Sequence, residues 1–259
     1  MAMRTRQQHT VMAGTSGWAY PSWKPGFYPA KLPAKRFLEH YGSRLNSVEV
    51  NYTFRALPTV EQLEGWMAAV AKSFRFSFKA PEAITHRRRL GECEDALEEF
   101  LESIEPVRRA GALGCILFQL PPNFKADHAR LQGFLELPGM KKIKRAAFEF
   151  RHESWFMKET WALLRTHEVA LCVAESESLQ TPDVLTAKSF ACYRLRMPGG
   201  YSPQQLAQHA EQFRALSARR DVYVYYKHEE EPTGALAAEA VLQQLLEAAA
   251  AAPECLPTG

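Results

Sequence analysis

The chain of 259 residues contains no apolar run that approaches the roughly 20 residues of a membrane-spanning helix. It also has little net charge, because 32 Lys and Arg against 29 Asp and Glu leave +3, too small a surplus to imply a nucleic-acid or membrane partner. The first ten residues lack the apolar core and cleavage site of a secretion signal. We therefore expect a cytoplasmic protein without a membrane partner, in which any basic site is local.

Two other kinds of signature are missing. The five cysteines are odd in number and show no Cys-x-x-Cys spacing, which favours reduced structural thiols over a disulfide framework, with a nucleophilic cysteine as the alternative. The segment Gly14-Thr15-Ser16-Gly17 does not match the glycine-rich turn of a dinucleotide-binding sheet, and no phosphate-binding loop of the G-x-x-x-x-G-K-[ST] type occurs. Nothing in the sequence therefore identifies a nucleotide cofactor.

Short segments rich in β-branched and aromatic residues alternate with longer segments of helical period. Only the connection formed by residues 175–188 lacks a convincing helix. The predicted strands are residues 11–16, 47–52, 74–79, 115–120, 145–150, 169–174, 189–196 and 222–226. Eight strands alternating with about seven helices predict a single (β/α)₈ TIM barrel in the α/β class. A doubly wound open sheet is the alternative.

No linker or internal repeat divides the chain. We expect one TIM-barrel domain over residues 11–250, a flexible N-terminal tail over residues 1–10 and a loose C-terminal tail over residues 251–259. The alanine run at residues 248–252 is expected to end the last helix.

Polar side chains gather at the predicted carboxyl ends of the strands, where TIM barrels build their sites. The alternation of side chains along a strand turns them toward the barrel mouth. These candidates are Glu49, Asn51, Lys79, Gln119, Glu149, Arg151 and Arg194. The cations suit a carboxylate or phosphate, and two glutamates in different environments could act as general acid and base. The alternative is a self-satisfied network of ion pairs that plugs the barrel.

Loops at the same end supply further candidates. His86 follows the third strand and is expected to orient the substrate or an intermediate. Residues 17–33 carry five aromatic side chains, of which Trp18 and Tyr20 are expected to contact the substrate as part of a lid, with a satellite hydrophobic cluster as the alternative. The pair Gly199-Gly200 precedes a capped helix, a place where barrels often bind phosphate.

Histidine and carboxylate side chains near the strand ends are of the types that bind zinc, iron or manganese. They are His86, His152, His228, Glu49, Glu149 and Glu175. Their spacing matches no metal-binding motif, so the sequence assigns no metal ligand, although a divalent metal remains compatible with the mouth.

Several distinct motifs occur in order along the chain. They are Gly14-Thr15-Ser16-Gly17-Trp18, Phe27-Tyr28-Pro29, Val48-Glu49-Val50-Asn51, Phe118-Gln119-Leu120-Pro121-Pro122, and Glu149-Phe150-Arg151 with Ser154-Trp155. Together they resemble the YecE-like family, catalogued as domain of unknown function seventy-two. The resemblance runs from residue 14 to about residue 246. It implies a single (β/α)₈ barrel and no established activity.

We predict an enzyme of the hydrolase or lyase type that acts on an anionic, phosphorylated substrate. Lys79, Arg151 and Arg194 would hold the anion, while Glu49 and Glu149 would move protons. One alternative is a non-catalytic barrel that binds an anionic metabolite, and another is a carbohydrate-active enzyme that uses the two glutamates. A nucleic-acid backbone is a further anionic partner to test, although nothing indicates base reading. The oligomeric state is not predictable from these patterns.

Overall fold

The computed structural model describes residues 9–175, 179–227 and 230–251. Eight strands occur at the eight places that the sequence predicts. They are β1 (Val11–Thr15), β2 (Ser47–Val50), β3 (Arg75–Lys79), β4 (Leu113–Gln119), β5 (Ala146–Glu149), β6 (Ala170–Ala174), β7 (Phe190–Leu195) and β8 (Asp221–Tyr226). Most of both predicted tails, residues 1–10 and 251–259, lies outside the described residues, and the last helix includes Ala251.

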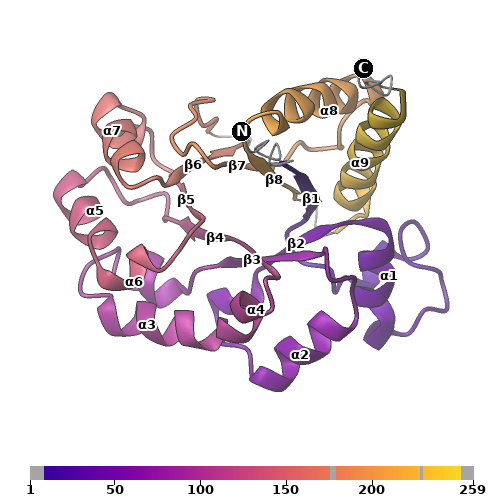
Figure 1. Cartoon of the computed structure of the whole chain (residues 1–259), viewed down its shortest axis with the longest axis horizontal. Coiled ribbons are helices and arrows are strands. Elements are labelled where there is room, and N and C mark those ends of the chain that lie inside the picture. Colours follow the sequence, from indigo (N-terminus) through magenta and orange to yellow (C-terminus); the bar gives the residue numbers. More distant parts are fainter. Residues whose placement is uncertain (1–8, 176–178, 228–229, 252–259) are drawn as a thin grey trace, which may run out of the picture.

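The eight strands form one parallel sheet in the order β1-β8-β7-β6-β5-β4-β3-β2. An isolated parallel bridge between Ser16 and Glu49 links the two ends of this sheet, which is thereby nearly closed into a barrel (Figure 1). The prediction of a (β/α)₈ TIM-barrel fold is confirmed, and the open doubly wound sheet is excluded because its edge strands would not meet.

Helices surround the barrel on the outside (Figure 1). They are α1 (Phe37–Arg44), α2 (Val60–Ala68), α3 (Glu94–Ser103), α4 (Glu105–Arg109), α5 (His128–Leu135), α6 (Pro138–Lys141), α7 (Lys158–Thr166), α8 (Pro203–Ser217) and α9 (Thr233–Ala251). The short helices α4 and α6 were not predicted, because one turn of helix is too short to show an apolar period. Within residues 175 and 179–189, the connection from β6 to β7 contains no helix, as expected.

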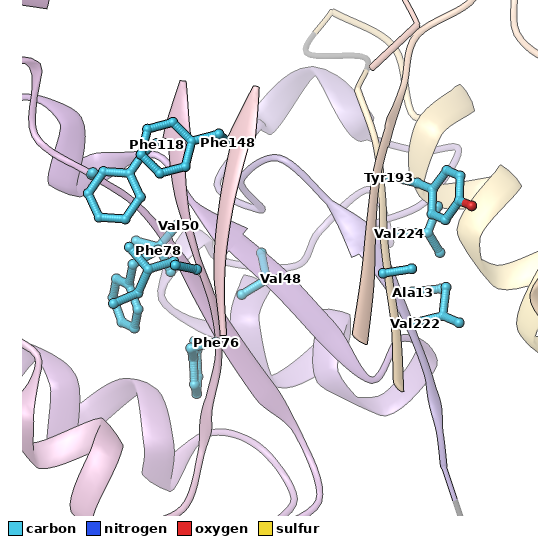
Figure 2. Packing of buried hydrophobic residues seen from close by; sticks show 14 of the residues in the cluster. Ala13, Val48, Val50, Phe76, Phe78, Phe118, Phe148, Tyr193, Val222 and Val224 are labelled. Atoms are coloured by element: carbon cyan, nitrogen blue, oxygen red, sulfur yellow. The ribbon is translucent and has the colours of Figure 1, made fainter. Parts of the chain in front are cut away.

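The two faces of the strands carry different side chains. Outward-facing residues such as Val48, Phe78 and Phe148 are buried in the layer between strands and helices, and Figure 2 shows this packing. In the same outer layer on another part of the barrel, Tyr193 packs against Phe213 of α8 with ring centres 5.1 Å apart. Burial of this apolar layer is the main stabilising contribution to the fold, at about 25 cal/mol per Å² of apolar surface.

Inside the barrel, a second and smaller cluster fills the lower part. It consists of Cys115, Leu117, Ala147, Ala170, Cys172, Ala187, Phe190, Cys192, Tyr223 and Tyr225. The four described cysteines are free and buried, which matches the prediction of structural thiols, and Cys255 lies outside the described residues. Because side chains fill the lower barrel, the space for a ligand lies at its carboxyl end.

Candidate functional site

A layer of polar side chains lies directly above the apolar filling of the barrel. It contains Ser16, Glu49, Gln119, Glu149 and Arg194, which come from the carboxyl ends of five strands, and we call it the buried network. Glu49 is 1% exposed, and Glu149 and Arg194 are each 5% exposed. Charged side chains are rarely buried to this extent unless they are paired.

One guanidinium pairs both carboxylates of the buried network. Arg194 Nη2 and Nε donate to Glu49 Oε1 at 2.9 and 3.2 Å, and Nη1 donates to Glu149 Oε2. Gln119 Nε2 donates to the other oxygen of Glu149 at 2.7 Å, while the Ser16 hydroxyl donates to Glu49. The sequence-predicted residues Glu49, Gln119, Glu149 and Arg194 therefore meet in a network of ion pairs. The network expected as the alternative paired the two glutamates with Lys79 and Arg151, whereas the structure pairs them with Arg194.

Electrostatics keep Glu149 and Arg194 of the buried network ionised. Burial alone would raise the pKa of Glu149, but the charge of Arg194 and the hydrogen bonds from Arg194 and Gln119 hold that pKa below its usual value. Burial acts to lower the pKa of Arg194, yet Glu149 and Glu49 raise it well above the ordinary range. Glu149 is therefore a carboxylate at neutral pH and does not have the protonated form that a general acid needs.

Lys79, at the end of β3, lies at the mouth but outside the buried network. Its Nζ lies 4.0 Å from the centre of the Phe54 ring, and no carboxylate of the described residues lies within ion-pair distance of it. Burial, together with the positive charge of Arg194, lowers the pKa of Lys79 to about 8. A substantial share of this amine is therefore neutral near physiological pH.

Asn51 joins the buried network through one atom only. Its Nδ2 donates to the Ser16 hydroxyl at 2.8 Å, whereas its Oδ1 is buried without a hydrogen-bond partner. A buried acceptor without a donor is unfavourable, so this oxygen is suited to receive a hydrogen bond from a ligand.

His86 contacts the same Phe54 ring as Lys79. It belongs to a π-helical turn, η4 (Ala83–Arg87), and its ring packs edge-on against Phe54 with centres 4.9 Å apart. Such turns are rare and often occur at functional sites. Burial and the positive charges of Lys79 and Arg151 lower the pKa of His86, which is therefore neutral at physiological pH. Its Nδ1 lies 2.9 Å from the Thr85 hydroxyl, so Nε2 is the nitrogen left for a substrate.

A cavity of about 90 Å³ opens beside the buried network. Gln119, Glu149 and Arg194 line its inner side. The rest of its polar lining consists of Arg151, Glu175, Thr181, Arg196 and Lys227. This polar and cationic lining suits the carboxylate or phosphate group of a ligand.

The charges around the cavity are unbalanced in favour of cations. Arg151 and Arg196 are exposed, and neither forms an ion pair with any residue in the described part of the chain. Glu175 accepts a hydrogen bond from the Tyr201 hydroxyl. Guanidinium groups that lack protein partners can bind an anion with two parallel hydrogen bonds.

Trp18 and Tyr20 do not line this cavity. Trp18 packs edge-on against Trp66 of α2 at 5.2 Å, and the Tyr20 hydroxyl donates to the Ser16 carbonyl at 2.8 Å. Farther along the same loop, Trp23 and Tyr28 are fully buried with stacked rings. The aromatic side chains of this part of the loop belong to the main hydrophobic core rather than to a separate satellite cluster, which was the expected alternative to a lid.

The described residues contain no group of three or more His, Cys, Asp or Glu side chains arranged to hold a metal ion. His152 Nδ1 instead lies 2.9 Å from the Ser154 hydroxyl, and the candidate ligand His228 lies outside the described residues. The loop with Gly199 and Gly200 leads into α8, whose first turn is capped by Ser202 and Gln205. These caps occupy amide groups that a phosphate would need.

Two residues of the mouth were not singled out from the sequence. Lys227 follows Tyr223 and Tyr225 in the period of two that marks inward positions, so this alternation could have identified it. Phe54 lies on a 3₁₀ turn after β2 (Tyr52–Phe54), and no periodic pattern shows which strand end its ring covers.

None of the helices in the described ranges is both long enough and apolar enough to cross a bilayer.

Comparison with known proteins places the chain among barrels of the same kind. The sequence profile described as "Protein of unknown function DUF72" matches residues 12–258. The UPF0759 protein YecE of Escherichia coli (strain K12) is 33% identical over 150 residues, which are 57% of this chain and 51% of that protein. The UPF0759 protein YunF of Bacillus subtilis (strain 168) is 27% identical over 151 residues, or 56% of this chain and 52% of that protein. The match thus spans about half the length of these curated relatives.

Solved structures resemble this fold over almost the whole chain. A DUF72 family protein from Thermotoga maritima MSB8 superposes with a TM-score of 0.79 at 25% identity and covers 92% of this chain and 100% of its own. Another DUF72 family protein, from Enterococcus faecalis V583, has a TM-score of 0.71 at 19% identity and covers 92% of this chain and 98% of its own. The second likeness concerns the fold alone.

Proposed function

The chain belongs to the DUF72 family, whose function is unknown, and from the geometry of its barrel mouth we propose that it is an enzyme acting on a small anionic substrate. The observation that carries this proposal is the cavity of about 90 Å³, at which Arg151, Arg196 and Lys227 surround the paired charges of the buried network. A carboxylate or phosphate group of the substrate would fit between these cations. The reaction would be of the hydrolase or lyase type.

The proposed roles follow from which side chains are already paired. Arg151 and Arg196 bind the anionic group, because both are at the cavity and lack ion-pair partners among the described residues. Glu49 and Glu149 hold Arg194 in place, since both carboxylates already accept from its guanidinium. The lowered pKa values of Lys79 and His86 leave neutral forms near pH 7, so these two side chains are the ones suited to proton transfer or to attack on the substrate. This assignment replaces the acid and base roles that the sequence suggests for the two glutamates.

The arrangement supports carbohydrate hydrolysis less well. Glycosidases place the scissile bond between two carboxyl groups, one of which is protonated. Here a guanidinium lies between Glu49 and Glu149, and the pKa of Glu149 is lowered.

A thermal-shift screen tests the anion site. The panel contains phosphosugars, nucleotides, oligonucleotides and dicarboxylates, each with and without magnesium or manganese. We expect a selective rise in Tm that is lost in the variant Arg151→Ala/Arg196→Ala and retained in Arg165→Ala, which removes an exposed arginine from the outer face of α7. A rise that persists in the double variant, or no rise with any compound, would contradict the proposal.

The self-satisfied buried network also supports a second function, a non-catalytic barrel that binds an anionic metabolite. Because such a barrel would not change its ligand, prolonged incubation of the protein with the compound that raises Tm separates the two. Product detected by mass spectrometry, and absent with Lys79→Arg, identifies the enzyme. Unchanged ligand identifies the binding protein.

A further inference from the structure

Lys79 differs from the lysines that form ion pairs in this protein. Lys142 and Lys188 are exposed and pair with Glu98 and Glu168. Lys79 is half-buried, contacts the Phe54 ring, and has no carboxylate within 4.0 Å in the described part of the chain. Its position at the end of a barrel strand therefore leaves an amine available for chemistry.

The surrounding backbone holds the amine and its aromatic neighbour together. The Thr53 hydroxyl donates to the Lys79 carbonyl at 2.6 Å, and the next residue along the chain is Phe54. This bond ties the loop after β2 to the end of β3, so that the Phe54 ring remains over the Lys79 side chain. An aromatic wall excludes water from the amine and makes its ammonium form less favourable.

The amine also lies close to the proposed anion site. The charged groups that act on it most strongly are Arg194, Glu49, Glu149 and Lys227. Three of these four, Arg194, Glu149 and Lys227, line the cavity. Lys79 itself does not line the cavity, but it lies in register with Leu117 of β4, two residues before the cavity-lining Gln119. A substrate whose anionic group occupies the cavity can therefore extend its reactive group toward the amine.

We propose that Lys79 is a catalytic nucleophile that forms an imine with the carbonyl carbon of a small oxo acid. This inference rests on the proposed function, because the carboxylate or phosphate of the oxo acid is held by Arg151 and Arg196. The chemical class of the substrate is then a carbonyl compound with an anionic group a few bonds away.

The step balances without any further reagent. The nitrogen lone pair of the neutral amine attacks the carbonyl carbon, and the C=O electron pair moves to oxygen, which takes up a proton to give a carbinolamine. The C–O bond then breaks with loss of water as the C=N bond forms, so that amine and carbonyl compound become imine and water. The neutral ring of His86, which contacts the same Phe54 ring as Lys79, can carry the proton between nitrogen and oxygen.

Reductive trapping tests the proposal on the full-length protein. Pyruvate and sodium cyanoborohydride at pH 8 convert an imine into a stable secondary amine, which peptide mapping by mass spectrometry locates. Lys24 is the matched control within the same sample, because its Nζ also lies over an aromatic ring, that of Phe37, at 5.2 Å. We expect Lys79 to be labelled at least about tenfold faster than Lys24, because an amine with a pKa of about 8 is about half neutral at this pH. Equal labelling of the two would overturn the proposal.

A second probe distinguishes the reactivity of the Lys79 amine from the binding of an anionic group by Arg151 and Arg196. Formaldehyde, which carries no charge, reports the reactivity of the amine alone. Preferential labelling of Lys79 by formaldehyde but not by pyruvate overturns the oxo-acid class. Pyruvate labelling of Lys79 that is undiminished in Arg151→Ala/Arg196→Ala supports the nucleophile and instead overturns the proposed anion site. The variant Lys79→Arg, which keeps the positive charge, should unfold like the wild type and lose the label.

Discussion

The buried network and the rim of the same barrel mouth, formed by Arg151 and Lys79, both carry charged side chains. The charges of the buried network are paired, and those of the rim have no carboxylate partner among the described residues. In the buried network, Arg194 is matched by Glu49 and Glu149, and all three are at most 5% exposed. At the rim, Arg151 and Lys79 have no carboxylate within ion-pair distance among the described residues. A deeply buried charge without a partner costs a large desolvation energy, so it must be paired. A charge that stays in contact with water costs less and can remain unpaired until a ligand binds. The difference separates the part of the mouth that supports the fold from the part that can act on a substrate.

Removing the guanidinium should have the largest effect. Arg194→Ala leaves two carboxylates buried without a cation, and we expect the free energy of unfolding to fall by about 3–5 kcal/mol. Arg194→Lys keeps a charge but loses the forked geometry that reaches both partners, so its loss should be smaller. Urea unfolding at pH 7 measures both. If Arg194→Ala were as stable as the wild type, the buried network would not support the fold.

Removing one carboxylate should have an intermediate effect with a defined pH dependence. Glu149→Gln should lower the free energy of unfolding by about 1.5–3 kcal/mol at pH 7, which is typical of a hydrogen bond to a charged group. Because the folded-state pKa of Glu149 lies below the unfolded value near 4.3, its stabilisation is complete above that value and is lost as the pH falls through the folded pKa.

Urea unfolding of the wild type and Glu149→Gln between pH 3 and pH 8 checks this dependence. The stability difference should remain constant from about pH 6 to 8 and shrink below about pH 4. A difference that grows on acidification would mean that Glu149 is protonated in the native protein.

The comparison also shows which parts of the site could be predicted from sequence. The period of two places Glu49 and Glu149 inside the barrel, because a neighbouring apolar set on each strand must face the helices. The same pattern does not distinguish a guanidinium that binds substrate from one that binds two glutamates. That distinction depends on strands β2, β5 and β7 meeting across the barrel, at sequence separations of 45 and 145 residues from Arg194.

Loop residues were the least predictable. The aromatic content of residues 17–33 fits both a lid and a hydrophobic cluster, and the choice depends on long-range partners such as Trp66. Phe54 is similar, since its role follows from the fold of a short turn rather than from any repeating pattern. Strand ends obey an alternation that the sequence displays, while loops depend on contacts that it does not display.

The smallest expected effect has the opposite sign. Lys79→Met removes a partly buried cation that lacks a carboxylate partner, so we expect a gain of about 1 kcal/mol in the free energy of unfolding at pH 7, after allowance for solvent screening. The folded-state pKa of about 8 lies below the unfolded value near 10.4, so the wild type gains stability relative to the variant as the pH rises through this interval.

Urea unfolding at pH 7, 9 and 10.5 measures how the difference in the free energy of unfolding between the wild type and Lys79→Met changes with pH. The control is Lys24→Met, which removes another lysine whose Nζ lies over an aromatic ring. The difference in the free energy of unfolding between the wild type and Lys79→Met should shrink as the pH rises. A loss of stability in Lys79→Met at pH 7 would show that the ammonium is favourably held at the rim, which would remove the distinction between rim and buried network. A gain would mean that the fold retains an unfavourable amine at its mouth, as expected when a residue is kept for its reactivity rather than for stability.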